Sequence, residues 1–94
     1  MKTFLVCYEI REINDKSFDD FHNYLKNVSL KYFHVLNSAT LIQTDTEIDE
    51  IQKTLYEIAT RPGNKMFYFV LEIPTERSKV RGWIFNSFWD WFQK

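Results

Sequence analysis

The sequence has little of several residue types that define protein classes. Its 94 residues include one cysteine, Cys7, so it forms no internal disulfide or cysteine-based metal cage and needs no oxidising compartment. Two glycines and two prolines exclude a collagen-like or low-complexity chain. No window approaches the roughly 20 apolar residues that cross a bilayer, and Glu9 interrupts the first apolar stretch too early for a secretory signal. We therefore expect a cytoplasmic protein that does not insert into membranes.

Charge of one sign is also lacking, since the net charge is −1. Residues 1–50 hold five Lys/Arg and nine Asp/Glu (−4), and residues 51–94 hold seven and four (+3). A protein that depends on phosphate contacts usually carries a clear basic excess, so indiscriminate nucleic-acid binding is disfavoured. The one basic patch alternates Arg77, Lys79 and Arg81. In an extended segment these side chains either grip phosphate or protect a sheet edge by their charge.

Large apolar side chains are abundant. Apolar residues make up 45% of the chain, which has nine Phe, five Tyr and three Trp. A chain of this length supports one core, so we predict a single domain over residues 1–94. Residues 1–74 are its core, and residues 75–94 are a basic edge segment followed by an aromatic C-terminal element that forms a short helix.

Periodicity predicts the elements of this core. Residues 2–10 alternate with apolar side chains on both faces, as in a central strand. A helix is expected after Ser17 as N-cap, because apolar residues follow at helical spacing; they are Phe18, Phe21, Leu25 and Val28. Residues 32–44 are expected to be one bent strand, or a strand approached by an extended loop.

The second half repeats the pattern. Asp45 or Thr46 is expected to cap a second helix, whose apolar stripe is formed by Ile48, Ile51, Leu55 and Ile58. A third strand is expected over residues 65–73. The sequence thus predicts an α+β fold, a ferredoxin-like sheet with two helices on one face. Its fourth strand would come from residues 32–36, from residues 75–81 or from a partner chain.

The predicted packing leaves one face of an aromatic-rich sheet bare. Apolar surface of that size argues for a partner, most simply a second copy of the chain. The aromatic C-terminal element is expected to be buried against the sheet, the partner or both, with a base-stacking platform as the alternative.

Four segments of the chain resemble the small SinR-like proteins. They are the first strand up to Tyr8-Glu9, the segment His34–Asp45, the strand from Asn64 to Ile73, and the closing Gly-Trp…Trp-x-Trp motif at residues 82–91. That family is itself similar to the CRISPR-associated adaptation nucleases, which are ferredoxin-like homodimers. The resemblance implies this fold and a homodimer.

The resemblance also implies a site at the end of the first strand. An Asp closes that strand in the nucleases and holds a divalent metal across the dimer axis, and Glu9 matches it here. Glu9 would then hold Mg²⁺ or Mn²⁺, with Tyr8 beside it and Arg11 near the phosphate. In the simpler interpretation, Glu9 lies in water and pairs with Arg11, and Tyr8 points to the helices.

Three hypotheses for function remain open. The first is a dimeric module that associates with DNA, RNA or a protein partner, with or without metal-dependent cleavage. The second is a ribonuclease toxin like virulence-associated protein D. The third is a protein-interaction or inhibitor protein that binds through its apolar face and C-terminal aromatics. His22 and His34, the two histidines, are predicted to face solvent and to have a structural role, respectively.

Overall fold

The computed structural model of the chain describes residues 1–74, 76, 81–82 and 89–90. The elements in this part are β1 (Lys2–Glu12), α1 (Asp15–Val28), β2 (Lys31–Leu36), β3 (Ala39–Thr44), α2 (Ile48–Ala59) and β4 (Lys65–Glu72). The predicted basic segment and aromatic C-terminal helix fall mostly outside the described residues and stay predictions. None of the described helices is long and apolar enough to span a bilayer.

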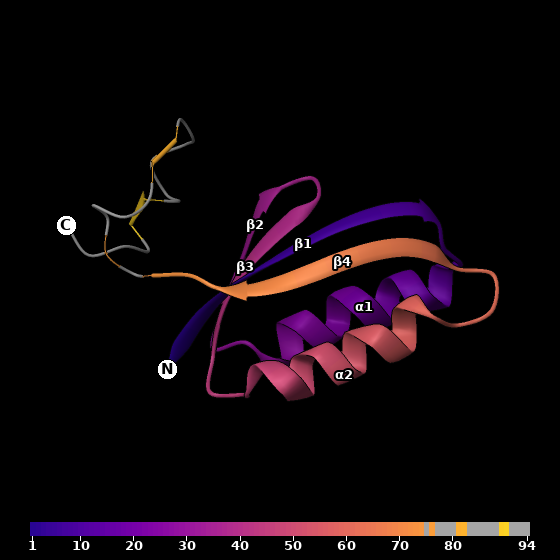
Figure 1. The fold of residues 1–94 in the computed structure, drawn as a ribbon, viewed down its shortest axis with the longest axis horizontal. Coiled ribbons are helices and arrows are strands. Elements are labelled where there is room, and N and C mark those ends of the chain that lie inside the picture. The colour runs from indigo at the N-terminus through magenta and orange to yellow at the C-terminus, as the bar shows by residue number, and fades with distance from the viewer. Residues whose placement is uncertain (75, 77–80, 83–88, 91–94) are drawn as a thin grey trace.

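The strands form one antiparallel sheet in the order β2-β3-β1-β4, and both helices lie against the same face of it (Figure 1). The predicted α+β class, with a sheet and two helices, is confirmed. The strand order is compatible with a ferredoxin-like arrangement. β1 pairs with β3 on one side and β4 on the other, which confirms the central strand expected from its two apolar faces.

The core lies between the sheet and the two helices. Alternation along β1 turns Phe4, Val6 and Tyr8 toward the helices, where they are buried. The helical stripes meet them, through Phe21 and Leu25 of α1 and then Ile51, Leu55 and Ile58 of α2. Full burial of one such side chain contributes about 1.5–3 kcal/mol to folding. Burial of these two stripes therefore packs the helices against the sheet.

Residues 32–44 do not form a single strand, and that prediction was wrong. Asn37 and Ser38 are the turn of a β-hairpin between β2 and β3. The fourth strand therefore comes from the residues around 32–36, one of the three sources left open. The register shifts between His34 and Leu36, so a bulge bends β2 near the turn.

The predicted helix caps were also wrong. Asn14, not Ser17, is the N-cap of α1, and its side-chain oxygen accepts a 2.8 Å hydrogen bond from the Ser17 backbone N–H. Ser17 lies inside the first turn and is buried. At α2 the N-cap is Glu47, with no side-chain cap hydrogen bond, rather than Asp45 or Thr46.

One member of the α1 stripe is outside the core. Phe18 is 44% exposed, and its ring lies 4.4 Å from the ring of His22, one turn later on the same helix.

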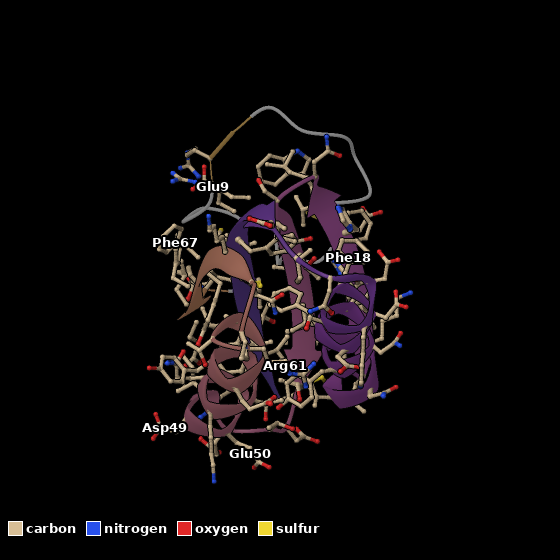
Figure 2. All side chains as sticks on the ribbon, turned by 90° about the vertical axis from the view of Figure 1, so that its right-hand side faces the viewer. Glu9, Phe18, Asp49, Glu50, Arg61 and Phe67 are labelled. Carbon is tan, nitrogen blue, oxygen red and sulfur yellow. The ribbon has the colours of Figure 1, made fainter. Side chains whose placement is uncertain are left out.

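A polar contact through Arg61, just beyond α2, links the two helices. Its Nη1 donates to Asp20 of α1 at 2.7 Å, and its Nε and Nη2 donate to Glu57. In Figure 2, Arg61 lies between the two helices.

Candidate functional site

Glu9 lies near the end of β1, on the face of the sheet away from the helices. Its side chain is exposed. Arg11 stands two residues further along the strand, on the same face, and its Nη2 donates to Glu9 Oε2 at 3.4 Å. The carboxylate therefore already has a cationic partner. Such an exposed pair contributes little to stability, about 0–1 kcal/mol, so it leaves both groups available to a ligand.

An aromatic ring completes this cluster. Phe67 of β4 is the cross-strand partner of Glu9, and the Arg11 guanidinium lies 5.5 Å from the centre of the Phe67 ring. A cation over an aromatic face gains about 0.5–1 kcal/mol at an exposed site. Figure 2 shows Glu9 and Phe67 on the same side of the molecule. The sheet surface near the end of β1 thus has a carboxylate, a guanidinium and a ring side by side.

Tyr8 is not part of this cluster. Because adjacent residues of a strand point to opposite faces, its side chain lies among the helices, with its ring 5.2 Å from the Phe21 ring. Its hydroxyl is 3.5 Å from Thr40 Oγ1. Burial raises the pKa of this phenol. The structure therefore places Tyr8 and Glu9, which the resemblance set together, on opposite sides of the sheet.

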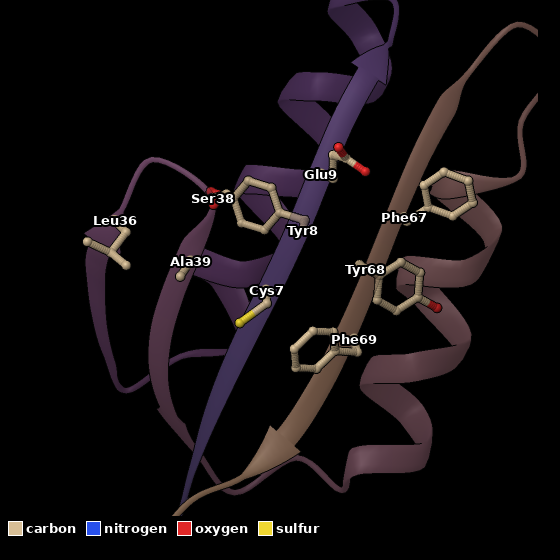
Figure 3. Close-up of a pocket in the computed structure, with 9 residues that line it drawn as sticks. All are labelled: Cys7, Tyr8, Glu9, Leu36, Ser38, Ala39, Phe67, Tyr68 and Phe69. Carbon is tan, nitrogen blue, oxygen red and sulfur yellow. The ribbon is translucent and has the colours of Figure 1, made fainter. Parts of the chain in front are cut away.

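An open pocket of about 370 Å³ adjoins Glu9 (Figure 3). It lies between β1, β4 and the β2–β3 turn, and its walls are mainly apolar. They include Cys7, Leu36, Ala39, Phe67 and Phe69, with Glu9 and Ser38 as polar members. Cys7 is half-buried there, and burial raises its pKa, so the thiol is held in its neutral form. A surface of this kind suits contact with apolar groups rather than acid–base chemistry.

Three exposed apolar side chains near this pocket come from β4, and a fourth, Leu36 (56% exposed), comes from β2. Phe67, Phe69 and Leu71 alternate along the strand and are 63%, 57% and 39% exposed. No single one of them was predicted as a site residue. The sequence did contain a pattern that predicts this exposed surface. Residues 65–73 are apolar on both faces, although the helices cover only one face of the sheet.

Both histidines line a shallow groove between α1 and β2. His22 is half-buried rather than solvent-facing, with its ring 5.7 Å from the Tyr8 ring. Burial, and then the charges of His34 and Lys26, lower the pKa of His22. His34 is exposed and is the cross-strand partner of Thr40. The groove lies on the helix side of the sheet, away from Glu9.

The predicted phosphate-binding row cannot be assembled from the described residues. Arg81 is exposed, whereas Arg77 and Lys79 lie outside the part of the chain that the structure describes. The row therefore stays a prediction.

The residues present do not by themselves fit Mg²⁺ or Mn²⁺. Mg²⁺ needs near-octahedral oxygen ligands at about 2.0–2.1 Å, usually including one or two carboxylates. One chain offers Glu9, already paired with Arg11. Within the described residues, no group of three or more His, Cys, Asp or Glu side chains is placed to hold a metal ion. A metal at Glu9 would have to displace Arg11 and draw ligands from elsewhere.

No family model matches the chain, and neither the curated proteins nor the solved structures include a significant match.

Proposed function

We propose that the protein is a small cytoplasmic homodimer of ferredoxin-like fold, similar to the CRISPR-associated adaptation nucleases, that acts as a binding module and does not cleave. The strand order β2-β3-β1-β4 with both helices on one face supports the fold. The observation that carries the function is the row of exposed apolar side chains on β4 beside the Glu9–Arg11 pair.

The chemistry of this surface favours contact over catalysis. Arg11 neutralises Glu9, so the pair presents no strong net charge to a metal. The same guanidinium is exposed and able to exchange Glu9 for a phosphate oxygen, which it would bind through paired N–H groups. Phe67, held under Arg11, offers a flat ring to a base or to an apolar side chain. Nucleic-acid association and protein binding therefore use the same cluster.

Metal-dependent cleavage of DNA or RNA is the second candidate, and it includes the ribonuclease-toxin hypothesis. One observation favours it, because Glu9 is an exposed carboxylate near the end of the central strand and borders a pocket. Cleavage would require water to attack phosphorus as an ester oxygen leaves. Glu9 would have to be freed from Arg11 before it could serve that reaction.

A cleavage assay separates the two candidates. Purified protein is incubated with labelled single- and double-stranded DNA and RNA, with Mg²⁺, Mn²⁺ or EDTA. The variants are Glu9→Gln and, as a matched control, Glu12→Gln, which removes a second exposed carboxylate of the same strand. We expect intact substrate with every protein. Metal-dependent cleavage that is lost in Glu9→Gln and kept in Glu12→Gln would overturn the binding-module proposal, and cleavage of RNA alone would favour the toxin.

Binding is tested with the same substrates by fluorescence anisotropy. We expect Arg11→Gln to weaken nucleic-acid binding and to flatten its salt dependence, because one phosphate contact is lost. If the wild type binds no nucleic acid, but Trp89→Ala and Trp91→Ala abolish capture of a protein partner, the protein is instead a protein-interaction module.

A further inference from the structure

β4 is an edge strand whose outer backbone groups point away from the rest of the sheet. Ile73 N–H donates to Thr3 C=O at 3.0 Å, whereas Tyr8 N–H donates to Ser38 C=O on the β3 side of β1. In an antiparallel pair, the residues whose N–H and C=O face the partner alternate along the strand. The odd-numbered residues of β4 therefore bond to β1. Met66, Tyr68 and Val70 direct their N–H and C=O groups outward, where none of the described strands lies.

The two edges of the sheet differ in how they are protected. β2, at the far edge, has six residues, a bulge next to Leu36 and exposed Lys31 and His34, all features that discourage edge pairing. β4 has eight residues and no proline, and its register with β1 is unbroken from Met66 to Glu72. A continuous, mostly apolar edge of this kind is a template for another strand.

The exposed apolar surface of the sheet is concentrated at this edge. On the face away from the helices, Leu41 of β3 is fully buried and Leu5 of β1 is half-buried. Three exposed apolar side chains of this face, Phe67, Phe69 and Leu71, belong to β4, and one, Leu36 (56% exposed), lies at the turn end of β2. This distribution favours association along the edge over stacking of two sheets face to face.

We propose that a second copy of the chain pairs with this edge, β4 against β4 in antiparallel orientation. An antiparallel pair of strands is slightly more stable per residue than a parallel pair, which favours the antiparallel orientation. The inference rests on the homodimer of the proposed function and names its interface.

Two-fold symmetry restricts the register to those centred on one residue of β4. A two-fold axis between antiparallel strands requires residues of the same face to stand opposite each other. Centring the axis on Tyr68 sets Phe67 opposite Phe69 of the partner and Met66 opposite Val70 of the partner. A centre at Phe69 would instead set Met66 against a charged Glu72, whereas the Tyr68 centre sets Leu71 against Lys65, whose long side chain reaches solvent. The Tyr68 register joins the two sheets into one, with all helices on the same face.

The size of the interface predicts its strength. Phe67, Phe69 and Leu71 leave on the order of 300 Å² of apolar side chain exposed per copy, given 150–250 Å² for a whole aromatic side chain. A standard interface buries roughly 800 Å² per partner. Pairing of the β4 backbones adds to this buried side-chain area. We therefore expect a dimer that dissociates at roughly micromolar concentration.

Complementary charge variants test the interface by analytical ultracentrifugation of the full chain. Phe67→Lys/Phe69→Lys sets like charges opposite each other, and Phe67→Glu/Phe69→Glu does the same with the other sign. We expect each variant alone to weaken dimerisation by roughly thirty-fold or more, and a mixture of the two to restore it. Leu36→Lys, which changes an exposed apolar residue on the hairpin strand β2, is the control and should leave the dimer intact.

Cysteine cross-linking tests the register independently of these surface changes. In a Cys7→Ser background, Phe67→Cys is mixed with Phe69→Cys under mild oxidation. In this register, Phe67 and Phe69 of the two copies form a pair without mutual hydrogen bonds, with Cα atoms about 4.5 Å apart, within disulfide range. We expect the mixture to cross-link faster than either variant alone.

The outcomes distinguish this inference from the proposed function. A wild-type monomer at all concentrations would overturn both the homodimer and its interface. A dimer that is unaffected by Phe67→Lys/Phe69→Lys, or that Leu36→Lys disrupts equally, would overturn the β4 interface but not the homodimer. Equal cross-linking in all samples would overturn the Tyr68 register.

Discussion

Arg61 Nη1 donates a 2.7 Å hydrogen bond to Asp20 Oδ2 and so joins the end of α2 to the first half of α1. Asp20 also accepts from Lys16 at 3.1 Å. These two donors, Arg61 first, hold the pKa of Asp20 below its ordinary value of 3.8. The helices are therefore linked by a polar contact outside the apolar core.

We expect Asp20→Asn to lower the free energy of unfolding at pH 7. A carboxylate whose pKa is lower in the folded state stabilises the fold above its unfolded pKa and loses that effect as pH falls through the folded pKa. The difference between Asp20→Asn and wild type should therefore shrink as pH falls below the ordinary value of 3.8 and through the lower pKa of the folded state. Urea titrations at several pH values measure it. Asp19→Asn, an exposed neighbour, is the control, and an equal pH dependence in both variants would contradict the prediction.

The cap of α1 is tested by replacing Asn14, whose side-chain oxygen accepts the capping hydrogen bond. Asn14→Ala removes the acceptor for Ser17 N–H and should cost about 1 kcal/mol of stability. Asn14→Asp keeps an oxygen in that position and should cost less. Thermal and urea unfolding give both values. If Asn14→Ala and Asn14→Asp were equally stable, the loss would not come from the cap.

Two phenylalanines with opposite environments make a matched pair. Phe21 is fully buried, and Phe67 is 63% exposed. Phe21→Ala should cost about 3–5 kcal/mol, a large share of the 5–15 kcal/mol typical of a small domain. Phe67→Ala should change the stability of the single chain by less than about 0.5 kcal/mol. Unfolding at low protein concentration separates this effect from dimerisation, and similar losses in the two variants would contradict the packing described.

The lowered pKa of His22 predicts a pH dependence of stability. Burial is its main cause, followed by the charges of His34 and Lys26. The unfolded chain binds a proton at His22 more readily than the folded chain does, so stability should fall as pH drops below 6.5, and His22→Gln should reduce that fall.

Proton NMR titration of the imidazoles checks this directly. His34→Gln should raise the pKa of His22, but not to its ordinary value of 6.5, because burial remains. A His22 that titrates at its ordinary value of 6.5 in the wild type would contradict both expectations.

Much of the fold could be predicted from periodicity. The central strand β1, both helical stripes and β4 follow from apolar spacing, which reports directly on which side chains are buried. The hairpin of residues 31–44 could not be recognised, because Asn37-Ser38 is a weak turn signal inside a long run of β-forming residues. The α1 cap was misplaced since Asn14 and Ser17 are both good capping residues.

The candidate site was predicted only in part. Glu9 and Arg11 are close together, as two residues of one strand face must be. The position of Phe67 under Arg11 depends on the β1–β4 register, which local sequence does not specify. Local sequence also does not specify the contact between Arg61 and Asp20, which lie 41 residues apart in the chain.

The central position of β1 sets the order in which the protein assembles. β1 is made first, yet its partners β3 and β4 end at Thr44 and Glu72. On the ribosome, most of the core sequence must be synthesised before β3 or β4 can pair with β1. Contacts that span so many residues slow folding and leave apolar surface open to aggregation. We therefore expect nascent chains that stop before β4 to depend on chaperones.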